Sequence, residues 1–278
     1  MQVSSDQRVA NPFLKWVGSK RYLLPEILPR LPAKINTYYE PFLGGGAVFF
    51  ALASDQRFKR AAIGDANEEL MNLYAQIRDN PSSLMGFNFD QDEKSFYRIR
   101  AQDPATLPPL ARAARTIYLN KVGFNGLYRV NRKGVFNVPW GKQEGRSIFD
   151  EANILACSAA LQQAALLAID FEMATVPAKR GDVAYFDPPY WPASATANFT
   201  AYAAGGFGPK DQERLRDVAK KLHARGVYVL LSNSDTPFVR DLYSDFKIES
   251  VQAPRRVNSK GDKRGNVGEL LISGKNAK

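Results

Sequence analysis

The stretch that decides the fold is TYYEPFLGGGAVFFALASDQRFKRAAIG, residues 37–64. Residues 37–40 and 60–64 have the short apolar character of strands, and residues 47–53 between them have that of a helix. A glycine turn, residues 44–46, joins the first strand to the helix. Strand, glycine turn, helix and strand together predict a βαβ unit, the building block of an α/β sheet.

The same rhythm returns toward the carboxyl end of the chain. The apolar patterns there predict three strands, two helices and a last pair of strands that are antiparallel. These are strands 165–170, 182–186 and 227–232, helices 209–225 and 237–243, and strands 246–252 and 267–272 on either side of a basic loop at 254–265. With a helix expected at 20–31, the fold class is α/β, with a doubly wound sheet.

Between these two halves the sequence changes character. From 68 to 102 the apolar residues recur at intervals of three and four, which predicts helices. Alternation in 127–140, around the turn-prone and positively charged segment 131–134, predicts a β-hairpin, and 149–164 predicts another helix. We therefore expect a mainly helical module with a hairpin, residues 76–164, inserted into a domain made of 1–75 and 165–278.

Composition narrows the partners. The chain has 278 residues, a net charge of +10 and a pI of about 9.6, which suits a polyanion such as nucleic acid. One cysteine, Cys157, and one histidine, His223, exclude an internal disulfide and a clustered zinc site, so we expect no metal. Without a long apolar run or a signal peptide, the expected protein is soluble and cytoplasmic, with no membrane partner.

The glycine turn predicts a ligand with a ribose. Asp65 follows Gly44 by 21 residues at the tip of the next strand, the spacing at which an acidic side chain takes ribose hydroxyls. Gly44 and Gly46 let the backbone approach the ligand closely, although three glycines also suit a tight turn without a ligand. No phosphate-binding glycine motif is present, so S-adenosyl-L-methionine fits better than a nucleotide phosphate.

Aromatic side chains near the expected strand ends suit the same ligand. The sulfonium of S-adenosyl-L-methionine is a cation that aromatic faces attract, and Trp16, Phe42 and Phe171 are candidates by position, although each also suits the core. Asp170 and Phe171 end a predicted strand at the carboxyl edge of the sheet, where ligands collect. We expect these two residues to contact the adenine of the cofactor.

The tetrapeptide Asp187-Pro188-Pro189-Tyr190 follows the apolar strand 183–186 and carries the predicted chemistry. An exocyclic amine of adenine is a weak nucleophile, because its lone pair is delocalised into the ring. The Asp187 carboxylate and the Pro188 carbonyl can each accept one amine hydrogen, so that the nitrogen lone pair points at the methyl donor. Tyr190 offers a face on which an extruded base stacks. Two prolines after a strand could also be a simple terminator.

With these motifs, the chain resembles the Dam family of adenine-specific DNA methyltransferases, in particular the DpnII-type enzymes that modify GATC. The resemblance covers nearly the whole length. It is carried by PFLKWVGSK (12–20), YEPFLGGGAVFF (39–50), DANEEL (65–70), NKVGFNGLYRVNRKGVFNVPWG (120–141), DPPY (187–190) and LSNSD (231–235). Where family members often have Gly-Gly before the lysine of the first block, this chain has Gly18-Ser19.

The resemblance implies roles for individual residues. Cofactor contacts are implied for Trp16, Lys20, Asp65 and Asp187. A Rossmann-like methyltransferase sheet that uses S-adenosyl-L-methionine is also implied, with a target-recognition domain inserted ahead of the DPPY strand. In the DNA, the resemblance implies that Phe124 wedges into the helix beside the flipped adenine and that Arg129 reads a guanine. Asn125, Asn131, Pro139 and Lys15 are implied as further DNA contacts, Lys15 at the first guanine.

Two alternatives stay open from the sequence. A DPPY-like turn also serves methylation of cytosine amines, RNA adenines and some protein amides, although the basic hairpin argues against a protein substrate. A DNA-binding regulator that has lost catalysis is the alternative outside enzymes. The leading interpretation is an adenine-specific methyltransferase that acts on double-stranded DNA as a monomer or weak dimer, in a bacterium or a phage, alone or in a restriction-modification system.

Overall fold

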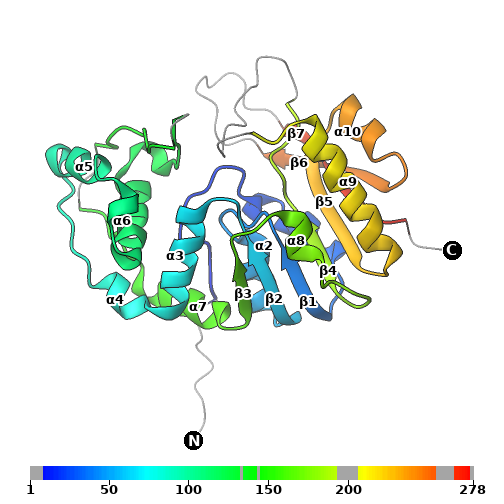
Figure 1. Ribbon diagram of the computed structural model, residues 1–278, viewed down its shortest axis with the longest axis horizontal. Coiled ribbons are helices and arrows are strands. Elements are labelled where there is room, and N and C mark those ends of the chain that lie inside the picture. The colour runs from blue at the N-terminus through cyan, green and yellow to red at the C-terminus, as the bar shows by residue number, and fades with distance from the viewer. Residues whose placement is uncertain (1–8, 132–133, 143–144, 193–205, 255–265, 276–278) are drawn as a thin grey trace, which may run out of the picture.

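A single seven-stranded sheet organises the chain (Figure 1). The computed structural model describes residues 9–131, 134–142, 145–192, 206–254 and 266–275. In the order β3-β2-β1-β4-β5-β7-β6, the first five strands are parallel and β7 is antiparallel to both of its neighbours. The strands are β1 Ile35–Glu40, β2 Phe58–Gly64, β3 Ala164–Leu167, β4 Val183–Phe186, β5 Tyr228–Ser234, β6 Lys247–Pro254 and β7 Asn266–Ser273. The α/β prediction, with its antiparallel last pair, is confirmed.

Alternation along the strands sends side chains into two cores, one on each face of the sheet. Tyr38 and Tyr185 belong to the core that also holds α2 (Ala47–Ser54), α3 (Glu68–Asp79) and α7 (Glu151–Leu161). Tyr39 and Phe186, one residue away in each strand, belong to the core beneath α9 (Pro209–Ala224). Because successive strand residues point to opposite faces, strands this apolar need helices on both sides.

The predicted helix at 20–31 is wrong as a continuous helix. The segment forms three short pieces, η1 Lys20–Tyr22, α1 Leu24–Ile27 and η2 Leu28–Arg30. Pro25 and Pro29 each stand in the first turn of a piece. Proline has no N–H to donate and tolerates only the first turn of a helix, so each one begins a new segment.

The middle of the chain is helical, as expected, and forms a lobe beside α3 at the β3 end of the sheet (Figure 1). Its elements are α4 Pro81–Met85, α5 Glu93–Arg100, η3 Pro104–Thr106, α6 Pro109–Val122 and η4 Phe124–Gly126. Helix α6 had no separate prediction, because its buried side includes Arg115, Thr116 and Asn120 and so lacks a continuous apolar stripe. The Arg115 guanidinium donates to the carbonyls of Ile99 and Arg100 at the end of α5.

The predicted hairpin at 127–140 is present only in part. Isolated bridges pair Gly123 with Trp140 and Val130 with Phe136, and no continuous ladder forms among the residues described there. Pro139 has no N–H to contribute to a ladder. The turn residues 132 and 133 lie outside the described residues, so the shape of the predicted turn is not part of the structure.

The strand predicted at 165–170 ends earlier, at Leu167. Asp170 is the N-cap of a short helix that the sequence pattern did not predict, α8 Phe171–Thr175, and its carboxylate accepts a hydrogen bond from the Glu172 amide. An aspartate at this position favours a helix start over a strand end. Helix α9 and helix α10 (Pro237–Leu242) begin at the predicted residue and end one residue before the predicted end.

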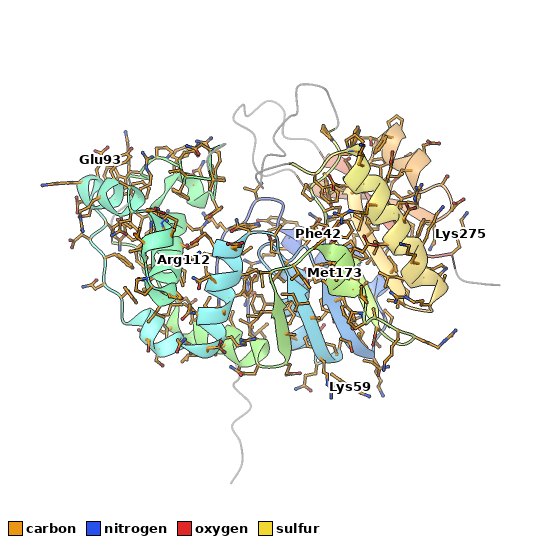
Figure 2. The ribbon with its side chains drawn as sticks, viewed as in Figure 1. Phe42, Lys59, Glu93, Arg112, Met173 and Lys275 are labelled. Carbon is orange, nitrogen blue, oxygen red and sulfur yellow. The ribbon has the colours of Figure 1, made fainter. Side chains whose placement is uncertain are left out.

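The sheet has a topological switch between β1 and β4. The chain winds from β1 outward to β3 on one side, and through β4 and β5 on the other. Ligands of open α/β sheets bind outside the carboxyl ends of the strands at such a switch. Figure 2 shows the two ends of the strands, with Phe42 beyond the carboxyl end of β1 and Lys59 at the opposite end of the sheet.

Candidate functional site

The carboxylate of Asp187 is the first side chain beyond β4, and two groups hold it. Lys20 Nζ lies 2.8 Å from Asp187 Oδ1, and Ser232 Oγ donates to the same oxygen at 3.0 Å. Since the serine has one hydrogen, the Tyr185 hydroxyl, 2.9 Å away, donates to Ser232. Burial raises the pKa of Asp187 above its ordinary value, and the nearby Lys20 ammonium opposes that rise.

The two prolines present their carbonyls differently. Pro189 O accepts a hydrogen bond of 3.0 Å from Gln212 Nε2, whereas Pro188 O has no donor within the described part of the chain. A carbonyl without a donor, next to a carboxylate, is an acceptor available to a substrate. The turn therefore offers two acceptors, Asp187 and Pro188 O, side by side.

Tyr190 is held by two contacts, one at its hydroxyl and one over its ring. Its hydroxyl donates to Glu269 Oε2 at 2.7 Å, and the Lys20 ammonium lies 4.6 Å from the ring centroid. Burial raises the pKa of Glu269 and of Tyr190. Lys20, which the resemblance placed with the cofactor contacts, thus touches both Asp187 and Tyr190 in this structure.

The glycine turn is tied to Asp65. Gly44 N donates to Asp65 Oδ2 and Asn67 N donates to Oδ1, each at 2.9 Å, and burial raises the pKa of this carboxyl. Gly44 and Gly46 adopt left-handed backbone with φ of 48° and 68°. A Cβ on Gly46 would lie 2.7 Å from Tyr74 Oη, so space as well as φ demands glycine there.

Trp16 covers this turn. A Cβ on Gly44 would meet Trp16 Cδ1 at 3.0 Å, so the indole lies directly on the turn. The indole also stacks on Tyr128, with the ring centroids 4.9 Å apart. At the Gly18-Ser19 departure from the family pattern, only Gly18 needs left-handed backbone, with φ of 78°, whereas Ser19 has φ of −50°, which any residue adopts.

The other predicted cofactor residues form an aromatic group at the carboxyl edge. Phe42 and Phe171 stack with centroids 5.3 Å apart. Asp170 is engaged by Arg214, whose two terminal nitrogens lie 2.9 and 2.8 Å from its two carboxylate oxygens. The same guanidinium lies 4.3 Å from the centroid of the Phe171 ring. Asp170 and Phe171 are therefore neighbours of Phe42, on the far side of β1 from the Trp16 cover.

Glu40 is a buried acid that the sequence did not single out. Its side chain at the end of β1 is 2% exposed and accepts a hydrogen bond of 2.9 Å from the Tyr38 hydroxyl. Burial raises the pKa of Glu40 well above its ordinary value, and the neighbouring Asp187 raises it further. Glu40 is therefore a further buried carboxyl group, close enough to Asp187 for the two to interact electrostatically.

The residues predicted to contact DNA lie around the partial hairpin. Phe124 is 48% exposed, Asn125 has a left-handed φ of 56°, and Pro139 O accepts a hydrogen bond from Phe124 N at 2.9 Å. Arg129 Nε donates to Asn137 Oδ1 at 2.7 Å, which braces an otherwise exposed guanidinium. Asn131 Oδ1 accepts a hydrogen bond from Val135 N at 3.1 Å, which joins the two sides of the partial hairpin.

Lys15 is joined to this group by a residue that the sequence analysis did not assign. The Asn120 side chain accepts from Lys15 N at 3.2 Å and donates to Lys15 O and Gly126 O, each at 2.9 Å. Asn120 is 1% exposed. Its presence inside the NKVGFNGLYR block was the only signal.

The segment 15–20 thus links three parts of the site. Lys15 is clamped to the hairpin end, Trp16 covers the glycine turn, and Lys20 reaches Asp187 and Tyr190. These contacts place the hairpin, the glycine turn and the DPPY turn on one side of the molecule.

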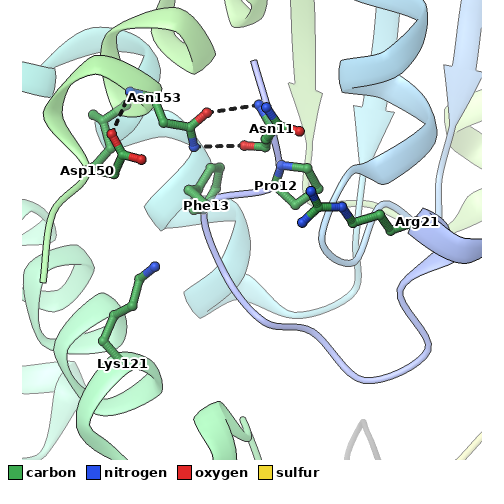
Figure 3. Close-up of a pocket in the computed structure, with 8 residues that line it drawn as sticks. Asn11, Pro12, Phe13, Arg21, Lys121, Asp150 and Asn153 are labelled. Atoms are coloured by element: carbon green, nitrogen blue, oxygen red, sulfur yellow. Dashed lines mark hydrogen bonds between the residues drawn. The ribbon is translucent and has the colours of Figure 1, made fainter. Parts of the chain in front are cut away.

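A separate cavity of about 220 Å³ lies between the N-terminal segment and helices α6 and α7 (Figure 3). Asn153 bridges its wall by exchanging two hydrogen bonds with the Asn11 backbone. The other lining residues are Pro12, Phe13, Arg21, Lys121, Asp150 and Ile154. None of the predicted catalytic, cofactor or DNA residues lines this cavity.

Over the described ranges, with their gaps, no cluster of His, Cys, Asp or Glu has the makings of a metal site. Within the same part of the chain, no helix is both long and apolar enough to cross a bilayer. Cys157 is fully buried and belongs to the same core as α3 and α7.

Comparison with known proteins adds the family. Residues 16–257 match the D12 class of N6 adenine-specific DNA methyltransferases. The chain is 42% identical to the type II methyltransferase M1.LlaDCHI of Lactococcus lactis subsp. cremoris, over 94% of each chain. It is 39% identical to the type II methyltransferase M.MjaIII of Methanocaldococcus jannaschii, over 94% of this chain and 98% of the relative.

A third relative carries a plainer description. The chain is 36% identical to a DNA adenine methylase of Haemophilus influenzae, over 94% of this chain and 92% of the relative. A solved precorrin-6y C5,15-methyltransferase of Geobacter metallireducens aligns with 95% of this chain at 8% identity and a TM-score of 0.40, too distant to inform the site. The family match and the three relatives agree that this chain belongs to the D12 class of N6 adenine-specific DNA methyltransferases.

Proposed function

We propose that the protein methylates the N6 amine of adenine within GATC in duplex DNA, by turning the base out of the helix into the Asp187–Tyr190 turn. The observation that carries this proposal is the position of Lys20. Its ammonium nitrogen lies 2.8 Å from Asp187 and 4.6 Å from the Tyr190 ring centroid. A turn that holds one amine nitrogen against a carboxylate and an aromatic ring has the chemistry to hold the amine of a stacked adenine.

The chain supplies positioning and charge. Asp187 accepts one amine hydrogen and the Pro188 carbonyl, which no described residue engages, accepts the other, while Tyr190 supports the base plane. As positive charge develops on the amine nitrogen, the negative Asp187 carboxylate stabilises it. After methyl transfer the amine must release a proton. The raised pKa of Asp187 suits this carboxylate to accept that proton at Oδ1 or Oδ2. For the base to enter, Lys20 must give up its contact with Asp187 or with the Tyr190 ring, while its hydrogen bond to Gly18 O can remain.

The residues at the switch point fit S-adenosyl-L-methionine. These residues include a carboxylate, Asp65, beside a left-handed glycine turn. They also include a stacked aromatic pair, Phe42 and Phe171, across β1. They contain no glycine loop of the phosphate-binding type. When bound, the cofactor supplies an electrophilic methyl on a sulfonium. Asp65 would hold its ribose, and Asp170 with Phe171 its adenine.

The lobe of residues 76–164 is proposed as the target-recognition domain. Phe124 is a large apolar side chain that projects into solvent, which suits a wedge between base pairs. Arg129 donates to Asn137 from Nε and, at 3.4 Å, from Nη2, which leaves Nη1 and the second hydrogen of Nη2 to meet the two acceptors of a guanine. Lys15, Asn125, Asn131 and Pro139 lie close enough in sequence or contact to complete this surface.

The experiment is to express the protein in cells that lack adenine methylation and to map modified bases by long-read sequencing. N6-methyladenine confined to GATC supports the proposal in full. Methylation of adenine at another sequence would remove GATC and keep the chemistry. N4-methylcytosine would overturn the choice of base, and unmodified DNA with methylated RNA would overturn the substrate.

Base flipping needs its own measurement. A duplex with 2-aminopurine in place of the target adenine should gain fluorescence when the protein binds, because the extruded base no longer stacks in the helix. The same duplex with 2-aminopurine moved two positions away is the control. Equal responses at both positions would contradict flipping into the DPPY turn.

A further inference from the structure

We propose that two buried amides, Gln212 and Asn233, form a relay that fixes the backbone on both sides of Tyr190 and thereby sets the angle at which the target amine is presented. The inference rests on the proposed role of the Asp187–Tyr190 turn. Gln212 and Asn233 would be positioning residues that do not touch the substrate.

Gln212 occupies a core position where its helix otherwise places apolar side chains. It is 0% exposed and shares the buried face of α9 with Leu215, Ala219 and Leu222. A polar side chain in such a position costs stability unless both ends of its amide are satisfied. Here both ends are used, since Nε2 donates to Pro189 O at 3.0 Å and Oε1 accepts from Asn233 Nδ2 at 3.1 Å.

Asn233 carries the relay to the other side of Tyr190. It lies at the end of β5, is 0% exposed, and its Oδ1 accepts from Trp191 N at 3.1 Å. The next residue, Ser234, donates from its hydroxyl to Trp191 O at 2.6 Å. Hydrogen bonds therefore fix the carbonyl before Tyr190 and the amide after it, and both lead back to the α9 and β5 framework.

The neighbouring residues show what the relay leaves free. Ser232, one residue before Asn233, holds the Asp187 carboxylate, so residues 232–234 at the end of β5 anchor Asp187 at one end of the turn and Trp191 just beyond its other end. Pro188 O, the carbonyl that follows Asp187 in the turn, takes no donor from the described residues, whereas Pro189 O does. The relay occupies Pro189 O and keeps it turned away, so that Pro188 O is the acceptor presented to the amine.

The first test is Gln212→Leu, which keeps a side chain of similar volume and removes both hydrogen bonds. The single-turnover rate constant for methylation of a GATC duplex should fall about tenfold to a hundredfold, because small misplacements of reacting groups have effects of that size. The dissociation constant for S-adenosyl-L-methionine and the KM for DNA should change less than about threefold.

The matched control is Asn153→Leu. Asn153 is another buried amide that bridges a backbone N–H and a backbone carbonyl, both of Asn11, and it does not touch the turn. The variant should lose stability with the single-turnover rate kept within about threefold. An equal loss of rate in both variants, or an unchanged rate in Gln212→Leu, overturns the inference.

A second variant keeps the test open if Gln212→Leu fails to fold. In Gln212→Glu the neutral acid can still donate to Pro189 O and accept from Asn233, whereas the ionised form cannot donate. The rate of the variant divided by that of the wild type should therefore rise as pH falls, a ratio in which the titrations of Asp187 and Glu269 largely cancel. A ratio that is flat between pH of about 6 and 9, although the variant binds the cofactor, overturns the inference.

The two proposals fail in different ways. If the wild-type protein does not methylate adenine, the proposed function fails. If the wild type methylates adenine and the Gln212 variants match it in rate and pH profile, only the relay fails.

Discussion

Replacing Asp187 with asparagine tests the proposed chemistry most directly, because shape is kept while the charge is removed. The 2.8 Å contact between Asp187 and the Lys20 ammonium shows how closely a cation can approach this carboxylate. At that distance two unit charges interact by about 6 kcal/mol with an effective dielectric constant of about 20. If about half a unit of charge develops on the amine, the loss is about 3 kcal/mol, or about a hundredfold in rate.

We therefore expect the Asp187→Asn single-turnover rate constant to fall between about a hundredfold and ten-thousandfold. The assay is transfer of a labelled methyl group to a GATC duplex, with enzyme and cofactor in excess over DNA. DNA binding, measured by gel shift, should stay within about tenfold, because the basic surface and its phosphate contacts are unchanged.

Asp182→Asn is the matched control, since Asp182 is a buried acid at the other end of β4. It is 2% exposed and accepts from Thr37 N at 3.0 Å and Lys179 N at 2.9 Å. Its replacement should lower the free energy of unfolding and leave the methylation rate within about threefold. A rate for Asp187→Asn within tenfold of the wild type, or an equal loss in Asp182→Asn, would refute the proposed role of the charge.

Three further predictions concern the recognition surface, the glycine turn and the buried acids. Arg129→Ala should cost about 1–3 kcal/mol of discrimination at one guanine, seen as methylation of sites altered at that base; an unchanged site preference would remove Arg129 from the readout. Gly46→Ala should destabilise the protein by about 2–5 kcal/mol in urea unfolding, from left-handed strain plus the clash with Tyr74 Oη, whereas Gly134→Ala, with similar φ and open space, should lose only the strain part. Burial raises the pKa of the Glu40 carboxyl well above its ordinary 4.5, so the native state holds the proton more tightly than the unfolded chain, and stability should fall as pH rises from 4.5 through the raised value; a Glu40→Gln protein with an equally steep fall would contradict this.

The strand patterns were predictable because each lies in a short apolar run that both faces of a sheet require. The runs at 37–40, 60–64, 182–186 and 227–232 correspond to β1, β2, β4 and β5. The failures have local causes that the pattern did not weigh. Prolines divide the helix expected at 20–31, and the Asp170 cap turns the end of the strand expected at 165–170 into a helix start.

The buried polar residues were the hardest to anticipate. Gln212 could have been noticed as a polar residue on the apolar face of an amphipathic helix, and Asn120 and Asn233 as members of the motif blocks. Their partners are backbone groups far away in the chain, such as Lys15 O for Asn120 and Trp191 N for Asn233. Periodicity reports which side of an element is buried, and it carries no information on which distant carbonyl or amide a buried side chain will meet.

The sequence by itself determined the α/β class and the helical character of the middle of the chain, and it predicted the chemical types of the site, because apolar periodicity and the motifs are local properties of the chain. Only the tertiary structure decided which of those side chains touch. It set Lys20 on Asp187 and Tyr190, where the resemblance implied a cofactor contact, and Trp16 between the glycine turn and Tyr128. The switch between β1 and β4 is the physical reason, since it brings the carboxyl ends of strands distant in the sequence to one edge of the sheet.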